Sequence, residues 1–339
     1  MLSVGLDAHH GYYAICVRDA TGRIVKETTV RGSSSQLLGQ LGRLGEPFAI
    51  CFEASCSYGH LHDRLAKIAH RVVVAHPGRL RLIFQSKRKT DRVDAQKLSL
   101  LLMLNEVPQV YVPSIDVRAW RRLIEFRSRQ VSERTRAKNT MRAMLRSFDI
   151  RAPRGLWSGK GMRWLAELEV PTRTAAIERD LTVDRIRQLN DHVKRLEGEL
   201  GRIASQHSGV MLLQTIPGVG PRTAEAVMAY IDNPRRFERT KAIGRYFGLV
   251  PCQDESAGKA RFGHVTREGP RTVRRMLTEA AWQAKRRSPE LAAYFDQVQR
   301  GDPARKKIAL VALGHRMARI MLSMLKTGET WQGARMRAA

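Results

Sequence analysis

Five short apolar runs in the first third of the chain constrain the fold more than any other feature. They cover residues 2–8, 12–18, 24–30, 48–53 and 71–75. The turn Asp19-Ala-Thr-Gly-Arg23 is typical of a hairpin, so the first three runs are expected to be antiparallel strands. The later runs alternate with helix candidates at 33–44 and 58–69 and with a helix starting near Thr90. The sequence therefore predicts an α/β domain spanning residues 1–113.

Four carboxylates occupy positions where this domain could bring them together. Asp7 and Glu53 follow apolar strands, and Asp91 and Asp94 stand three residues apart at the start of the helix that Thr90 would cap. Such a group is the arrangement of ribonuclease-H-like nucleases and could hold two metal ions about 4 Å apart. The alternatives are a strand-end turn for Asp7 and favourable helix-dipole positions for Asp91 and Asp94. We do not expect the nearby histidines to be metal ligands: His9, His10, His60 and His62.

The charge balance points to a polyanionic partner. The chain has 60 Lys and Arg against 32 Asp and Glu, a formal net charge of +28, which favours a nucleic acid over a ribosomal-type or membrane-surface role. Four cations surround the Asp91–Asp94 pair: Lys87, Arg88, Lys89 and Arg92. We recognise no apolar run of membrane-spanning length, no signal-peptide pattern and no paired cysteine motif, so we expect a cytoplasmic protein without a membrane partner.

The middle region, residues 114–208, is expected to be a coiled coil. Residues 117–148 follow a heptad spacing broken by cations, and residues 182–206 follow one without a break. The basic excess of the first helix favours phosphate contacts, with Arg118, Arg121 and Arg122 as candidates. Residues 151–172 are predicted to be an irregular connection. The two helices could form an antiparallel hairpin or pair with another subunit, and we favour a projection that dimerises.

Residues 209–330 are predicted to form a mostly helical domain, followed by a disordered tail at 331–339. Residues 212–230 resemble a helix-hairpin-helix, in which backbone N–H groups at Gly218 and Gly220 would face a phosphate; a tight helix connection is the alternative. Ser256 lies in a loop of small residues and could attack a phosphodiester, although most such serines are turn residues. Cations follow it in the sequence: Lys259, Arg261, Arg271, Arg274 and Arg275.

These segments together resemble the DEDD-type transposases of the insertion-sequence one-ten family, described as bridge-RNA-guided recombinases. The resemblance covers nearly the whole chain. It depends on the order and spacing of six segments: Val4-Gly-Leu-Asp7, Glu53, Lys89-Thr-Asp-Arg-Val-Asp-Ala95, Ile216-Pro-Gly-Val-Gly220, Gly248-Leu-Val-Pro251 and residues 256–269.

The resemblance implies a RuvC-like (ribonuclease-H-like) domain whose tetrad, Asp7, Glu53, Asp91 and Asp94, binds Mg²⁺. It also implies a C-terminal transposase domain whose serine, corresponding to Ser256, becomes joined to DNA. Dimers would assemble to tetramers on donor and target DNA, and a structured non-coding bridge RNA would select both sites. The chain departs from the family at Glu255-Ser-Ala-Gly258, which leaves the register of the serine open by one residue, and at Gly269-Pro270, where Pro270 can begin the next helix.

Two other functions remain compatible with the residues. A RuvC-like endonuclease or resolvase would use water as the nucleophile and leave Ser256 a structural residue. A non-enzymatic scaffold would only bind DNA or RNA, and substitutions in the tetrad would then leave its activity intact.

Overall fold

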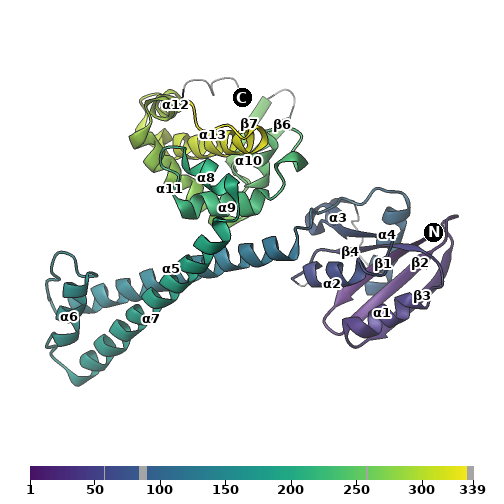
Figure 1. Ribbon diagram of the computed structural model, residues 1–339, viewed down its shortest axis with the longest axis horizontal. Helices are drawn as coiled ribbons and strands as arrows, with labels where there is room; N and C mark the ends of the chain where they lie inside the picture. The colour runs from purple at the N-terminus through teal and green to yellow at the C-terminus, as the bar shows by residue number, and fades with distance from the viewer. Residues whose placement is uncertain (57, 84–89, 257–258, 334–339) are drawn as a thin grey trace. The chain divides into compact units, whose positions relative to one another are not determined.

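The computed structural model describes residues 1–56, 58–83, 90–256 and 259–333. The chain divides into two compact units, Met1–Arg118 and Ala119–Ala339. Figure 1 shows the order of the helices and strands along the chain. Lys87, Arg88 and Lys89, which the sequence pattern assigned to nucleic-acid binding, lie outside the described residues.

The first unit contains a five-stranded mixed sheet with the order β3-β2-β1-β4-β5. The first three strands are antiparallel, and the last two run parallel to β1. The observed bounds confirm all five predicted strands, with small shifts at their ends: β1 (Leu2–His9), β2 (Tyr12–Arg18), β3 (Ile24–Arg31), β4 (Phe48–Glu53) and β5 (Arg71–Ala75).

Helices cover both faces of this sheet because the strand side chains alternate between two cores. On β4, Phe48, Ile50 and Phe52 pack with leucines of α1 (Ser34–Gly42) and α2 (Tyr58–Leu65). Ala49 and Cys51 point to the other face, where they pack with α3 (Pro77–Ile83) and α4 (Asp91–Met103). The sequence pattern predicted α1, α2 and α4, extended α2 four residues too far, and missed α3.

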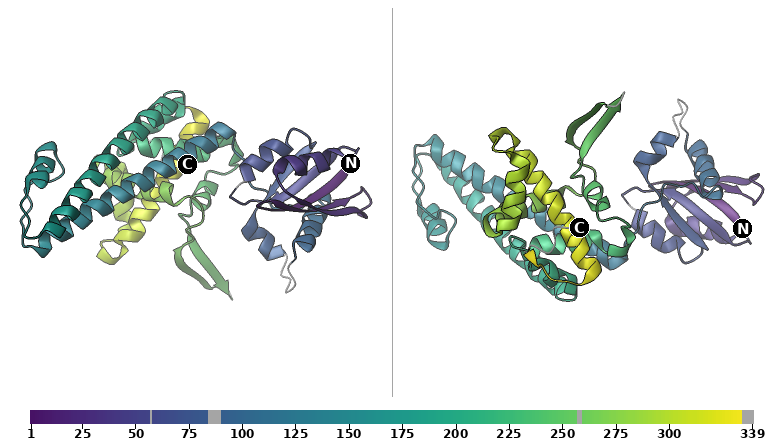
Figure 2. Two further views of the ribbon diagram at one scale, coloured as in Figure 1. Left: turned by 90° about the horizontal axis from the view of Figure 1, so that it is seen from below. Right: turned by 90° about the horizontal axis from the view of Figure 1, so that it is seen from above.

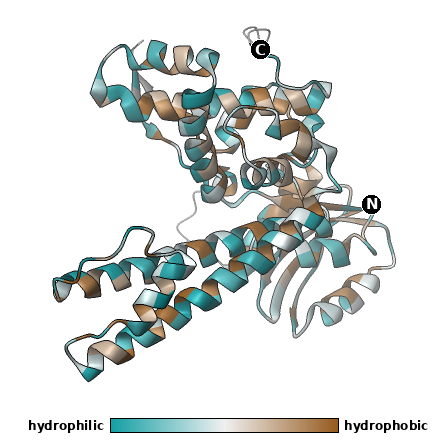
Figure 3. Ribbon diagram, turned by 60° about the vertical axis from the view of Figure 1, so that its left-hand side comes forward, coloured by the Kyte–Doolittle hydropathy of each residue, from teal (hydrophilic) through white to brown (hydrophobic). Residues whose placement is uncertain are grey.

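Two long antiparallel helices, α5 (Ile115–Ser147) and α7 (Arg173–Ala204), lie side by side in Figure 1, and the second unit includes all of α7 and the part of α5 from Ala119 onward. Polar contacts join them along their length: Arg127 Nε donates to Glu197 Oε1 at 3.0 Å, and Arg185 donates to Glu133 at 2.8 Å. The apolar positions form bands along otherwise hydrophilic helices (Figure 3). The heptads therefore pair within one chain, as the first of the two expected alternatives proposed.

The connection between these helices is more regular than the sequence predicted. Residues 159–167 form α6 (Gly159–Glu167), which Ser158 caps by accepting a hydrogen bond from the Gly161 N–H. Met162 and Leu165 of α6 are buried against Met141 and Ile186 of the two long helices. Helix α7 starts nine residues before the predicted position because Thr172 caps it at Ala175.

The remaining helices pack around one apolar core to which α13 (Lys306–Thr327) contributes more buried residues than any other helix. Around it lie α8 (Ser208–Gln214), α9 (Pro221–Ile231), α10 (Ala242–Tyr246), α11 (Arg271–Arg287) and α12 (Pro289–Gln299). The antiparallel hairpin of β6 (Pro251–Ser256) and β7 (Lys259–Val265) projects away from these helices (Figure 2).

The described residues include one helix with the length and apolar character of a membrane span, although the sequence pattern indicated none. Within residues 303–327, the most apolar window of 18 residues has a mean hydropathy of 1.4, and 56% of that window is buried inside the protein. Leu313, Met317 and Met321 of this helix are fully buried in the core. Its apolar character is accounted for by packing between helices.

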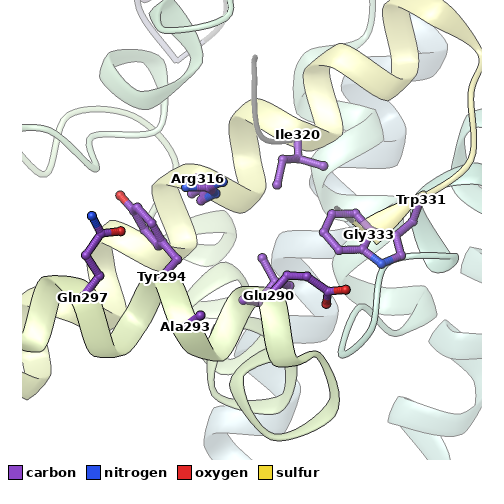
Figure 4. Close-up of a pocket in the computed structure, with 9 residues that line it drawn as sticks. Glu290, Ala293, Tyr294, Gln297, Arg316, Ile320, Trp331 and Gly333 are labelled. Carbon is purple, nitrogen blue, oxygen red and sulfur yellow. The ribbon is translucent and has the colours of Figure 1, made fainter. Parts of the chain in front are cut away.

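The chain beyond α13 returns to the helical core instead of leaving it at residue 331. The Trp331 N–H donates to Thr215 Oγ1 at 3.0 Å, and its indole packs against the core. In Figure 4 the Trp331 side chain lies beside Glu290 at a pocket that Tyr294 and Arg316 also line. The predicted tail therefore starts no earlier than residue 334, beyond which the structure gives no description.

Candidate carboxylate and nucleic-acid site

The strand register places Asp7 and Glu53 next to each other. In the parallel pairing of β1 and β4, Leu6 lies opposite Phe52, so the following residue on each strand is the acid. The carboxyl ends of parallel strands form one edge of a sheet. Helix α4 begins at the same edge, where Thr90 Oγ1 accepts a hydrogen bond from Val93 N–H at 3.3 Å, as the sequence predicted.

A glycine in β1 allows α4 to reach the acids. A Cβ atom at Gly5 would lie 2.0 Å from the Ala95 carbonyl oxygen and 2.4 Å from the Ser99 nitrogen, both in the α4 backbone. The other contacts on this face also involve small residues, with Ala14, Cys16 and Ala95 in one buried cluster. Because the helix backbone lies directly on the strand, the first turn of α4 is held beside Asp7.

Asp7, His9 and Asp91 form the closest group of ionisable side chains at this edge. His9 Nε2 lies 3.3 Å from Asp7 Oδ2 and 3.5 Å from Asp91 Oδ1. One potential ligand atom from each residue lies within 4.8 Å of the other two, which suits a bound metal ion. His9 was not expected to be a ligand. Its Nε2 can donate to the carboxylates or, as the neutral imidazole, offer a lone pair to a metal.

Burial makes the negative charge of Asp7 unfavourable without a cation. Its side chain is only 18% exposed, and desolvation raises the pKa of Asp7 above its usual value. His9 lowers this pKa, whereas the charges of Asp91 and Asp94 raise it further. A divalent cation would neutralise this set of acids, so the electrostatics agree with the geometry of a metal site.

The other two members of the expected tetrad are nearby but less closely engaged. Asp94 is near enough to act on the Asp7 charge, and its carboxylate lies 3.6 Å from the Lys97 ammonium. Glu53 ends β4 with an exposed side chain and is not one of the three residues whose ligand atoms converge. Assignment of Asp7, Glu53, Asp91 and Asp94 as a complete metal set stays a prediction.

Several of the candidate nucleic-acid cations are used in contacts within the protein. Arg92 pairs with Glu27, and Arg118 pairs with Asp63 and is 16% exposed. Arg121 donates to the carbonyl oxygens of Ala229 and Tyr230 at 2.8 and 3.1 Å. These groups position strands and helices, a role that their sequence pattern did not reveal.

A different cationic cluster lies farther along α5. Arg134, Lys138 and Arg142 are spaced four residues apart, so their side chains follow one stripe of the helix. Lys138 Nζ and Arg142 Cζ lie 5.1 and 5.3 Å from the centre of the Trp157 ring. Burial and the two arginine charges lower the pKa of Lys138. Like charges in one stripe repel, and a phosphate would relieve that repulsion.

Comparison with known proteins identifies the family. A model described as transposase, of the DEDD type named for IS110, matches residues 4–149, and a model described as the transposase IS116/IS110/IS902 family matches residues 210–296. Together the two matches cover more than half of the chain. This chain belongs to the IS110 family of transposases.

Relatives extend the similarity across nearly the whole transposase. A putative transposase of Sinorhizobium fredii is 26% identical over 85% of this chain and 75% of its own length. A probable family 20 transposase of Pseudomonas aeruginosa is 25% identical over 95% and 92%. The transposase for insertion sequence element IS1111A of Coxiella burnetii is 23% identical over 97% and 91%. Transposases act on DNA, and the family indicates an enzyme that cleaves and rejoins it.

The segment that resembles a helix-hairpin-helix consists of α8, a turn and α9. Gly218 has φ +88°, and a Cβ there would lie 2.4 Å from the Ala284 nitrogen of α11. Gly218 therefore permits the turn to pack on α11. Gly220 is exposed and precedes α9, and the structure leaves space around it. Of the two glycines, Gly220 is the one whose surroundings suit a phosphate.

The serine loop is described only in part. Ser256 ends β6 and Lys259 begins β7, but their side chains lie outside the described residues. Arg261 and Arg271 are exposed. Arg274 donates to the carbonyl oxygens of Glu268 and Gly269 at 2.8 and 2.9 Å, and Arg275 donates to Ser128 at 2.7 Å. Pro270 caps α11 instead of forming its first turn.

A buried acid in α9 makes stability depend on pH. Glu225 is 1% exposed and lies 2.6 Å from Arg222; burial outweighs the attraction of Arg222 and Arg127 and raises the pKa of Glu225 from 4.5 to about 7. The folded state thus binds this proton more tightly than the unfolded state. Its contribution to stability is present below pH 4.5 and is lost as the pH rises to about 7.

We expect Glu225→Gln to remove this loss, making the variant more stable than wild type at pH 8 by at most about 3 kcal/mol and similar to it at pH 5. Urea unfolding at both pH values measures the difference. Glu238→Gln makes the same change in charge at an exposed position and provides the control. If the difference in free energy of unfolding between wild type and Glu225→Gln is the same at pH 5 and at pH 8, the raised pKa of Glu225 is contradicted.

Proposed function

We propose that this transposase is a DNA recombinase that cuts and rejoins donor and target duplexes through a covalent phosphoserine intermediate at Ser256. The approach of Asp7 and Asp91 on either side of His9 is the observation that carries the proposal. Acids on separate elements, held together despite repulsion and burial, are typical of a metal-dependent phosphoryl-transfer site.

Asp7, Glu53, Asp91 and Asp94 are the residues that would hold Mg²⁺, with His9 as an additional donor. The convergence of two carboxylates and an imidazole within 4.8 Å supports this assignment. When bound, the ion stabilises negative charge on the reacting phosphate. Asp7 is fixed by β1, and Asp91 by the capped start of α4, so neither needs to be repositioned for binding.

Ser256 supplies the hydroxyl that attacks the scissile phosphorus. The new bond from Oγ to phosphorus replaces the bond to a deoxyribose oxygen, which leaves as a hydroxyl after gaining a proton. Attack by a hydroxyl of the other duplex then forms the new DNA linkage and releases the serine. Lys259 and Arg261 provide positive charge near the phosphate. The phosphoester link retains the capacity for rejoining, which simple hydrolysis loses.

A structured bridge RNA pairs with donor and target DNA, and the protein binds the nucleic-acid backbones. The net charge of +28 and the repelling stripe of Arg134, Lys138 and Arg142 support extensive phosphate contacts. Dimers assemble to tetramers, in which acids of one subunit and Ser256 of another complete each site.

The test compares wild type with Ser256→Ala in the presence of Mg²⁺, the flanking non-coding RNA and labelled donor and target DNA. On a denaturing gel we expect a protein-linked DNA band for wild type, and loss of both this band and recombined product for Ser256→Ala. Ser205→Ala removes a hydroxyl that is bonded to the Arg202 carbonyl oxygen at a helix end, and should retain both.

Either alternative function gives a different result in this experiment. Cleavage that persists in Ser256→Ala without a protein-linked band identifies a RuvC-like nuclease that uses water. Nucleic-acid binding without cleavage by any preparation, and without a change in the tetrad variants, identifies a scaffold.

A further inference from the structure

An open cleft in the second unit lies beside the N-terminal half of α5. It has a volume of about 740 Å³. Helix α5 provides most of its lining and Tyr230, at the end of α9, provides another part. The residues that decide its chemistry are Arg121, Arg122, Glu125, Phe126, Arg129 and Tyr230.

Internal hydrogen bonds make one wall of the cleft rigid. The Tyr230 hydroxyl donates to Glu125 Oε1 at 2.8 Å, and the Thr272 hydroxyl donates to Glu125 Oε2 at 2.6 Å. Arg121 lies over the Tyr230 ring at 4.8 Å while it donates to two carbonyl oxygens. Both oxygens of the Glu125 carboxylate are therefore occupied within the wall.

Three side chains on the other wall face the space without such bonds. Arg122, Phe126 and Arg129 follow the i, i+4, i+7 spacing and lie on one face of α5. The Phe126 ring is 43% exposed, and Arg129 Cζ lies 5.6 Å from its centre. Within the described ranges, neither Arg122 nor Arg129 makes an ion pair with an acid. The exposed ring offers a flat face for stacking, and the two cations beside it offer positive charge for phosphates.

We propose that this cleft binds a single-stranded segment of nucleic acid, with one unpaired base stacked on Phe126 and the adjacent phosphates on Arg122 and Arg129. Stacking on an aromatic ring and contact with guanidinium groups are the two contributions that hold single strands on proteins. The inference rests on the proposed function to the extent that the protein must act on nucleic acid. It adds that the nucleic acid bound in this cleft is single-stranded.

The chemistry favours an unpaired strand over the other occupants. Bases inside a duplex already stack on each other, so a duplex would contact the arginines and leave the Phe126 ring without a partner. A second copy of this chain carries the same charge of +28 and would bring further positive charge to the arginines. A loop of RNA and a displaced strand of DNA share the required chemistry.

The test measures binding of the full-length protein to oligonucleotides that contain the fluorescent base 2-aminopurine. Single strands of RNA and of DNA with one sequence, and a blunt DNA duplex, form the three arms. We expect fluorescence quenching in at least one single-stranded arm, because the base stacks on the ring. Phe126→Ala should weaken that binding by about tenfold and duplex binding by less than about twofold. The single strand that binds more tightly shows whether the cleft takes RNA or DNA.

Two further variants separate stacking from packing and charge. Phe126→Tyr keeps an aromatic ring and should retain the quenching, whereas Arg122→Gln should reduce the slope of log affinity against log salt by about 0.7 for a single strand. Ile308→Ala removes an exposed apolar side chain elsewhere, 57% exposed on α13, and should change nothing.

Equal losses on single strands and duplex, or unchanged single-strand binding by Phe126→Ala, would overturn the proposal. So would a lower sedimentation coefficient of Phe126→Ala with unchanged nucleic-acid binding, because the cleft would then contact a second copy. If wild type binds and recombines DNA while Phe126→Ala behaves identically, only this inference fails. If wild type binds none of the three oligonucleotides, the proposed function fails with it.

Discussion

Asp7→Asn is expected to lower DNA cleavage by about a hundredfold to a thousandfold without reducing the stability of the metal-free protein. Burial and the charges of Asp91 and Asp94 disfavour the ionised Asp7 carboxylate. The neutral amide is therefore an acceptable replacement in the metal-free fold. It provides one uncharged oxygen where a divalent cation requires a carboxylate, so the loss should appear in metal binding and in catalysis.

Two measurements separate these effects. Thermal unfolding of wild type with increasing Mg²⁺ should show a rising midpoint, because a ligand that binds only the folded state stabilises it. Asp7→Asn should have the same midpoint as wild type, or a higher one, without Mg²⁺, and the metal-dependent rise should be absent. Cleavage assays at a saturating Mg²⁺ concentration then test whether excess metal restores activity.

Asp116→Asn is the matched control. It makes the same change in charge at an exposed position in the first turn of α5, so nonspecific attraction of DNA changes equally. We expect wild-type cleavage and a wild-type response to Mg²⁺. If Asp7→Asn cleaves DNA as fast as Asp116→Asn does, Asp7 is no metal ligand, and the approach of the three side chains is a structural contact.

The sequence was sufficient to predict the sheet and the convergence of Asp7 with Asp91. Local patterns determine both: a short apolar run marks each strand, and Thr90 marks the start of α4. The role of His9 was not predictable, because it depends on the distance between a strand end and a helix that starts about 80 residues later. Gly5 was noted as part of a motif, but only the structure shows which backbone lies against it.

The helical half of the chain was harder to predict for a related reason. A heptad pattern shows that a helix buries one stripe, but the pattern is the same whether the partner is another subunit or the next helix of the chain. The bonds between α5 and α7 show that the next helix of the chain is a partner, and dimerisation of this region stays a prediction. Similarly, Arg118 and Arg121 could not be distinguished from phosphate-binding arginines, since their acceptors, Asp63 and the end of α9, are distant in sequence.

Gly5→Ala is expected to destabilise the first unit by about 3 kcal/mol and to separate the carboxylates. The new methyl group would meet the backbone of Ala95 and Ser99, which cannot yield as a flexible side chain can. Helix α4 must then move away from β1, carrying Asp91 away from Asp7. The midpoint temperature of thermal unfolding should be lower than that of wild type. Mg²⁺ should also stabilise the variant less than it stabilises wild type, even at temperatures at which the variant is fully folded.

Gly39→Ala tests the same substitution where the added methyl group meets nothing. Gly39 is exposed in α1, and a Cβ atom at this residue would have no neighbouring atom within 4 Å. Because alanine is the better helix former, this variant should gain about 0.5–1 kcal/mol. If Gly5→Ala is as stable as Gly39→Ala and keeps the full response to Mg²⁺, close packing of α4 on β1 does not position the metal-binding acids.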